Sequence, residues 1–170
     1  MARPVRSHRL SALCAVALGG LLSACGTEQP LEFAAGRSAA LSGAAATAMT
    51  VYSPRGQPVD EAGFVWLGPT EGLGGRVLEG EPKIFARLDY LKGPTAAGLF
   101  KATTGRIEVT FPFTEHATIL EGEVTITDSS GQSHDYKAGD SYLIRQGQVV
   151  VWEVKGKQVI KSFFNIVETH

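Results

Sequence analysis

The sequence predicts one all-β domain that follows an N-terminal segment of a different character. After about residue 50, short runs rich in β-branched and aromatic residues alternate with Gly, Pro and Asp. No long apolar pattern of period 3.6 follows that point. The total of 170 residues suits a single domain. Many short strands at short spacing predict a closed barrel or a sandwich, in which few strand edges stay exposed.

The N-terminus has the pattern of an export signal. Residues 1–9 carry three arginines, and residues 10–24 are apolar and small. An apolar run this short after a basic start is typical of a secretory signal rather than of a membrane span. The segment Leu22-Ser23-Ala24-Cys25 resembles the lipobox of bacterial lipoproteins, in which the cysteine thiol takes diacylglycerol and cleavage falls just before it.

The lipobox resemblance implies that residues 1–24 are a signal peptide and that Cys25 is the lipidated first residue of the mature chain. A lipid anchor would make the membrane a partner. Gly26 follows the cysteine, at the position where an aspartate favours retention of lipoproteins in the inner membrane. The rule for this family therefore favours the outer membrane, facing the periplasm, in a Gram-negative cell. The alternative is an ordinary signal peptide with an incidental cysteine.

Residues 25–50 are rich in Ala, Ser, Gly and Thr, which are too small to supply a core. This composition predicts a flexible tether ahead of a domain that spans residues 51–170. Both cysteines of the chain lie within the first 25 residues, so the domain has neither a disulfide nor a thiolate. Without residues 1–24, the chain has 13 basic against 17 acidic residues, a net charge of −4. This balance argues against a nucleic-acid partner.

The strands of the domain can be placed by their turns. The predicted turns are residues 129–131, 138–140 and 155–157, each containing glycine. The predicted strands are residues 105–111, 116–120, 122–127, 140–145, 148–154 and 158–167. Residues 51–97 contain five prolines, and there the stretches 64–67 and 83–88 are either short edge strands or irregular arms packed along the barrel.

Two stretches resemble the cupin superfamily: Glu115-His116-Ala117-Thr118-Ile119-Leu120-Glu121-Gly122-Glu123-Val124, and Gly139-Asp140-Ser141-Tyr142-Leu143-Ile144-Arg145-Gln146-Gly147 followed by Trp152-Glu153-Val154. They are most similar to single-domain cupins related to (S)-ureidoglycine aminohydrolase and to ethanolamine-utilisation cupins. The resemblance covers about residues 78–168. It implies a single cupin barrel of the double-stranded β-helix, or jelly-roll, type.

The metal ligands of that superfamily are mostly missing. Metal-binding cupins carry a His-x-His pair and a Glu on the first motif and another His on the second. Glu115 occupies the carboxylate position, but the histidine positions fall at Val109, Phe111 and Val150. Protein sites for transition metals normally need three or four donors. We therefore expect no cofactor, with a divalent metal (Mn, Zn, Fe or Ni) as the alternative. His116 is a weak candidate ligand, because adjacent residues of a strand point to opposite faces.

Strand alternation predicts an apolar interior that contains one carboxylate. If Glu115 points inward, so do Ala117 and Ile119, together with Val109, Phe111, Val150, Trp152 and Val154. A buried carboxylate has to be protonated, hydrated or paired. The predicted partner is Arg145, with Lys101 second. Phe111, Trp152 and Glu115 would then line a small-molecule pocket, unless these side chains simply fill the barrel.

Three functions remain open. The first is a metal-free lipoprotein that binds a small molecule or acts as a scaffold of the cell envelope. The second is a divergent metal-dependent enzyme that resembles the aminohydrolase. The third is an interaction module, in which two copies of the chain would form a homodimer. The sequence contains no Ser/His/Asp pattern, phosphate loop or dinucleotide fingerprint, so it identifies no catalytic residues.

Overall fold

A computed structural model describes residues 49–53 and 57–169. The predicted signal peptide, Cys25 and the tether as far as residue 48 lie outside the described residues. The described part is almost entirely β-structure, as the sequence predicts, and none of its helices is long and apolar enough to cross a membrane. Its elements are β1 (Val65–Trp66), η2 (Thr70–Leu73, a 3-10 helix), β2 (Gly75–Glu79), β3 (Ile84–Lys92), β4 (Thr95–Thr110), β5 (Thr114–Glu121), β6 (Glu123–Asp128), β7 (Ser133–Lys137), β8 (Ser141–Ile144) and β9 (Val149–Ile166).

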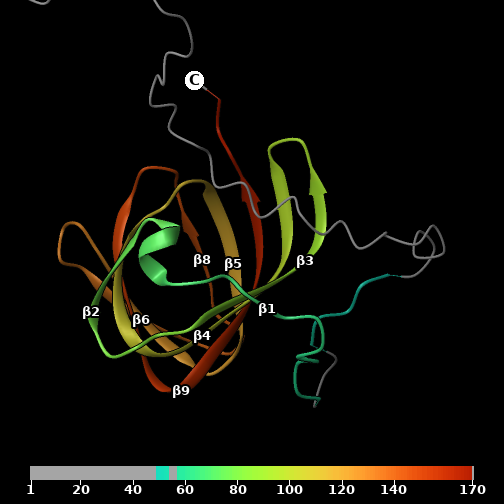
Figure 1. The fold of residues 1–170 in the computed structure, drawn as a ribbon, viewed down its shortest axis with the longest axis horizontal. Helices are drawn as coiled ribbons and strands as arrows, with labels where there is room; N and C mark the ends of the chain where they lie inside the picture. The colour runs from blue at the N-terminus through green and yellow to red at the C-terminus, as the bar shows by residue number, and fades with distance from the viewer. Residues whose placement is uncertain (1–48, 54–56, 170) are drawn as a thin grey trace, which may run out of the picture.

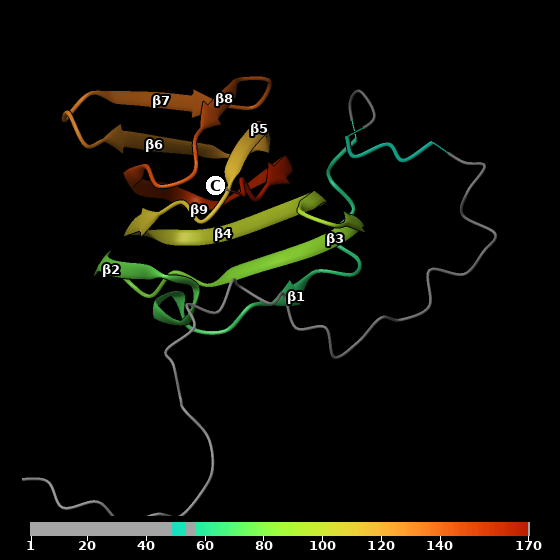
Figure 2. The same ribbon diagram turned by 90° about the horizontal axis from the view of Figure 1, so that it is seen from above.

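The strands form a jelly-roll barrel built around two long central strands (Figure 1). The order in the sheet is β1-β3-β4-β9-β5-β8, with β2 on β4 and with β6 joining β9 to β7. Strand β9 therefore pairs with β4, β5 and β6 along different parts of its length. Figure 2 shows β6 and β7 on one side of β9, and β4 and β3 on the other. The fold class predicted from the sequence is confirmed.

The predicted turn at residues 155–157 is wrong, because β9 continues through it. Thr103 pairs with Gln158 and Gly105 pairs with Val154, so three residues of β9 lie opposite Thr104 alone. The Thr104 hydroxyl donates to the Gly156 carbonyl at 2.5 Å and holds this bulge. A bulge bends a strand without reversing it. The turns at 129–131 and 138–140 are present as predicted.

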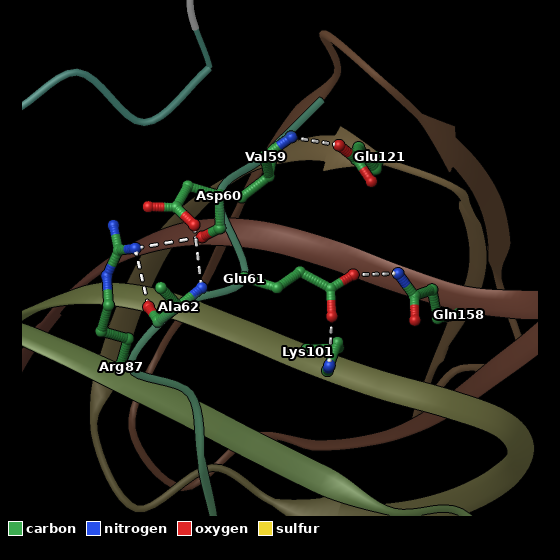
Figure 3. Close-up of polar contacts among 8 residues, drawn as sticks. All are labelled: Val59, Asp60, Glu61, Ala62, Arg87, Lys101, Glu121 and Gln158. Atoms are coloured by element: carbon green, nitrogen blue, oxygen red, sulfur yellow. Dashed lines mark hydrogen bonds and ion pairs between the residues drawn. The ribbon is translucent and has the colours of Figure 1, made fainter. Parts of the chain in front are cut away.

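Both alternatives for the proline-rich segment occur, in different parts of it. Residues 65–66 and 84–92 are strands, and β2 is an additional strand that the sequence did not indicate. Residues 57–63 form an arm that lies along the outside of the barrel (Figure 3). Glu61 on this arm accepts from Lys101 at 2.7 Å and from Gln158 at 2.9 Å.

The arm creates a second, smaller core on the outer face of the barrel. Val59 packs there with Leu99 and Ile160, which are completely buried. The main core lies inside the barrel and contains six of the side chains predicted to point inward: Phe111, Ala117, Ile119, Val150, Trp152 and Val154. Both faces of β9 are therefore buried where the arm crosses it.

Candidate functional site

The inside of the barrel holds a cavity of about 100 Å³ that is partly open to the outside. Its wall comes from strands β3, β4, β5 and β9, from residues 111–113, and from the segment that carries η2. The lining side chains are Leu67, Thr70, Leu73, Ile84, Ala86, Phe100, Ile107, Val109, Phe111, Pro112, Phe113, Glu115, Trp152, Lys161, Phe163 and Asn165, with Gly75. Figures 1 and 2 show the short helix η2 beside β2. Most of this wall is apolar.

A buried ion pair forms the polar part of the wall. The Lys161 ammonium lies 2.5 Å from Glu115 Oε1 and donates to the Tyr142 hydroxyl at 2.7 Å. The Tyr142 hydroxyl in turn donates to Glu115 Oε1 at 2.9 Å. The side chains of Lys161 and Glu115 are only 4% and 3% exposed. These three groups satisfy one another in a closed triangle, which is the condition under which buried charges persist.

Strand register brings the triangle together. Ile119 of β5 lies opposite Lys161 of β9, and Ala117 lies opposite Phe163 on one side and Tyr142 of β8 on the other. Glu115 lies opposite Asn165. Alternate residues of a strand share a face, so the odd-numbered residues in these stretches of β5 and β9 all point inward. Residues distant in sequence therefore converge on one volume.

Aromatic rings surround the Lys161 ammonium. Its Nζ atom lies 4.7 Å from the ring centre of Phe100, 4.9 Å from that of Trp152, 5.4 Å from that of Tyr142 and 5.9 Å from that of Phe111. Ring faces attract a cation, and the attraction grows when water is excluded. The rings and the carboxylate together offset the loss of hydration of the ammonium.

Burial shifts the proton affinities of this cluster. Loss of hydration lowers the pKa of Lys161, although the Glu115 carboxylate raises it by its charge and its hydrogen bond. Burial also raises the pKa of Tyr142 well above its ordinary value, and the adjacent Glu115 charge adds to this effect. The phenol is therefore a hydrogen-bond donor that does not ionise at neutral pH.

Three further polar atoms on the cavity wall are buried without a hydrogen-bond partner in the described part of the chain. They are Thr70 Oγ1, Trp152 Nε1 and Asn165 Oδ1. Each belongs to a side chain that lines the cavity and is at most 4% exposed. A buried donor or acceptor left unpaired costs about 1–3 kcal/mol. All three atoms belong to the wall of the same cavity.

The structure brings together three of the five predicted pocket residues. Phe111, Glu115 and Trp152 line the same cavity, and their role in binding stays a prediction. The predicted partners of Glu115 are wrong. Arg145 is exposed just beyond the end of β8, and Lys101 lies on the outer face, where it pairs with Glu61. Alternation explains the second error, because Lys101 is one residue away from the inward-facing Phe100.

Lys161 was missed although it lies in a predicted strand. The stretch Val159-Ile160-Lys161 is buried on both faces, so it shows no apolar alternation from which the inward face can be read. Its inward direction follows from the register, in which Asn165 lies opposite Glu115 and Lys161 is four residues away on the same face. Thr70 had no sequence signal, because it reaches the cavity from an irregular segment.

The residues around Glu115 do not fit a metal. The Lys161 ammonium lies against Glu115 Oε1, so this oxygen is already paired with a cation. Among residues 49–53 and 57–169, no group of three or more His, Cys, Asp or Glu side chains could hold an ion. His116 is exposed on the opposite face of β5, as its position next to Glu115 predicts. The expectation that no cofactor is needed stays a prediction.

Comparison with known protein families identifies the part of the chain that holds this cluster. Residues 91–163 match the model of the EutQ-like cupin domain. The matched stretch begins near the end of β3 and includes Glu115, Tyr142, Trp152 and Lys161. It excludes Thr70 and Asn165. No curated protein is similar to the chain in sequence.

Solved structures with a similar fold include a protein of the DUF861 family from Pseudomonas syringae pv. tomato, at 16% identity with a TM-score of 0.53. That alignment covers 60% of this chain but 43% of the other, so the chain spans less than half of that protein. The ethanolamine utilisation protein Q of Salmonella typhimurium has 19% identity and a TM-score of 0.45, over 51% of this chain and 72% of that one. The EutQ protein of Clostridium difficile has 11% identity and a TM-score of 0.46, over 51% and 69%.

Proposed function

Because the chain carries a cupin domain and its barrel holds a largely apolar cavity, we propose that it binds a small neutral molecule inside the barrel. The three unpartnered polar atoms on the cavity wall carry this proposal. A largely apolar cavity with a few convergent polar groups has the general character of a ligand site. The guest would be mostly apolar, with a polar group that pairs with Trp152 Nε1, Asn165 Oδ1 or Thr70 Oγ1.

The charge of the site selects a neutral guest. Glu115 and Lys161 neutralise each other, so the cavity wall carries no net charge. An anionic or cationic guest would bring an unpaired charge out of water, at an effective cost of several kcal/mol. A neutral amide, ketone, aldehyde or alcohol avoids this cost.

The size of the cavity limits the guest to a few non-hydrogen atoms. A dry cavity of about 150 Å³ is known to admit benzene. The cavity here, at about 100 Å³, is smaller. Four-carbon amides and carbonyl compounds are therefore suitable probes.

The ammonium beside Glu115 favours this function over the metal-dependent aminohydrolase alternative. An ammonium paired with Glu115 Oε1 would repel a metal cation at the same carboxylate. Substitution of Glu115 by Gln is then expected to change stability or ligand affinity and to leave the metal content of the purified protein unchanged.

Binding can be followed at the indole of Trp152. The chain has only two tryptophans, and Trp66 is 56% exposed and does not line the cavity. Butyramide should shift the NMR signal of the Trp152 indole N–H in a saturable way and leave the Trp66 signal in place. Asn165→Leu, which removes one polar partner, should weaken the affinity. Equal small shifts at both indoles would refute binding in the cavity.

We also propose that the domain is held at the cell envelope through a lipid on Cys25. The basic and apolar pattern of residues 1–24 and the lipobox resemblance support this proposal. In the expressing bacterium, the full chain should fractionate with membranes and should carry acyl chains on Cys25 by mass spectrometry. Cys25→Ala should release the protein. A membrane fraction that stays unchanged in this variant would refute the anchor.

A second candidate function, as a dimeric interaction module, has support on the outer face of the sheet. Register places Tyr90, Ala97, Phe164, His116 and Leu143 in one row across strands β3, β4, β9, β5 and β8. Tyr90, Phe164 and Leu143 are about half exposed. The row holds no Asp, Glu, Lys or Arg, so it can pack on the same row of a second copy about a two-fold axis.

Light scattering of the purified domain tests this dimer. Phe164→Asp combined with Leu143→Asp should convert dimers into monomers, because two copies would then bring like charges together. Val65→Asp, an equally exposed position on β1, is the matched control and should leave the dimer intact. A monomeric unmodified protein would refute the proposal.

A further inference from the structure

We propose that Lys161 forms a Schiff base with a small aldehyde or ketone that enters the cavity. This inference rests on the proposed binding function, and it names both the chemical class of the guest and the residue that reacts with it. The amine, the carboxylate and the cavity are already assembled on one wall.

Lys161 differs from the other lysines of the described chain by its position. It is the only one that is buried, and it is the only one that lines this cavity. Lysines that react with carbonyl groups are typically held in apolar surroundings, where the neutral amine is easier to form. The aromatic rings around Nζ provide such surroundings, and burial lowers the pKa of this amine.

Glu115 is placed to take the proton that the amine must lose. Its Oε1 atom lies 2.5 Å from the Lys161 nitrogen, which is within reach for direct transfer. In a medium of low polarity, the neutral amine and carboxylic acid compete more closely with the ion pair than they do in water. Tyr142 donates to the same oxygen and keeps the carboxyl group oriented.

The reaction balances without any oxidant or further reactant. The neutral amine attacks the carbonyl carbon and forms a C–N bond, while the π electrons of the carbonyl move to its oxygen. That oxygen takes the proton held by Glu115, and the amine proton returns to the carboxylate. Glu115 then gives this proton to the hydroxyl group, which leaves as water, and the nitrogen lone pair forms a C=N double bond. The products are one protonated imine, one water molecule and the Glu115 carboxylate.

The charge at the site is the same before and after this reaction. An ammonium paired with Glu115 becomes an iminium paired with Glu115, so no charge is left uncompensated in the barrel. Trp152 Nε1–H and the Thr70 hydroxyl are the unpartnered donors on the wall that could receive the carbonyl oxygen. A neutral carbonyl compound therefore satisfies both the charge and the hydrogen-bonding needs of the cavity.

Reductive trapping tests the inference on the full chain. The protein is treated with one equivalent of butanal and sodium cyanoborohydride near neutral pH, and the modified lysines are located by peptide mass spectrometry. Lys101 is a matched internal control, because it also pairs with a carboxylate and lies over two aromatic rings, but on the outer face. Because its amine is buried among aromatic rings on the cavity wall, Lys161 should be modified several-fold faster than Lys101.

The outcomes separate this inference from the proposed function. Modification of Lys161 at or below the rate of Lys101 overturns the Schiff base. If butyramide still shifts the Trp152 indole signal, the binding function stands without it. If neither response occurs, both proposals fail. Lys161→Met should lose the fast-reacting site and keep the others, and if this variant does not fold, the peptide analysis of the unmodified sequence decides alone.

Discussion

Removal of the buried cation should destabilise the barrel strongly. Lys161→Met keeps most of the length and the apolar character of the side-chain stem but leaves Glu115 without its ion partner. Both side chains are almost completely buried, at 4% and 3% exposure. Breaking such a pair from one side costs about 3–5 kcal/mol. Since a domain is typically stable by only about 5–15 kcal/mol, this one substitution would remove a large part of the total.

A second lysine–carboxylate pair, on the outer face of the barrel, serves as the comparison for Lys161 and Glu115. Lys101 and Glu61 also form an ion pair, at 2.7 Å, but the Glu61 side chain is 45% exposed. Exposed pairs contribute about 0–1 kcal/mol, so Lys101→Met should cost several-fold less than Lys161→Met. The difference between the two variants isolates the effect of burial from that of losing a lysine.

Urea unfolding of both single variants and of Glu115→Gln/Lys161→Met measures these values. The double variant should recover most of the loss, because it removes the uncompensated charge. The reasoning is refuted if Lys161→Met costs no more than Lys101→Met, or if the double variant is no more stable than Lys161→Met.

Three further predictions concern other parts of the fold. Tyr142 has a pKa raised well above its ordinary value, so its contribution is fully present below about pH 10 and is lost above it, where the unfolded chain ionises. Urea unfolding between about pH 8 and pH 11 should therefore show a steeper loss for the unmodified protein than for Tyr142→Phe, and parallel curves would contradict this. Gly122 has φ +77°, and an added Cβ would lie 2.1 Å from the Gln158 carbonyl oxygen. In thermal unfolding, Gly122→Ala should thus lower the stability by more than the roughly 1–2 kcal/mol that a left-handed backbone conformation costs an alanine. Gly131→Ala is the control, because Gly131 has φ +85° with open space around it, and this variant should show the backbone cost only. Glu61→Gln weakens the attachment of the arm, so proteolysis near residues 57–63 should become faster while the melting temperature changes by only a few degrees.

Much of the barrel could be predicted because its strands alternate cleanly. Ala117 and Ile119, for example, are apolar, and their neighbours Thr118 and His116 face the other side, so period-2 analysis places them in the interior. Residues 155–157 could not be placed in the same way. Lys155-Gly156-Lys157 has the composition of a turn, and only its pairing opposite Thr104 makes it a bulge within β9.

The candidate site also has one part that the sequence predicts and one part that it does not. That Glu115 points inward and needs a partner follows from local pattern and from the cost of burying a carboxylate. The identity of that partner does not follow from local pattern, because it depends on which residue of β9 lies beside β5. A register shift of one residue would turn the Lys161 side chain outward.

By itself, the sequence determined the all-β class, the apolar interior with one predicted carboxylate, and the scarcity of metal ligands. These are properties of residue types and of their spacing along one strand. Only the tertiary structure decided that Lys161 neutralises the acid, that Thr70 and Asn165 reach the same cavity, and that Lys101 belongs to the outer arm. Such pairings depend on long-range register and on an irregular segment, and no local pattern encodes either.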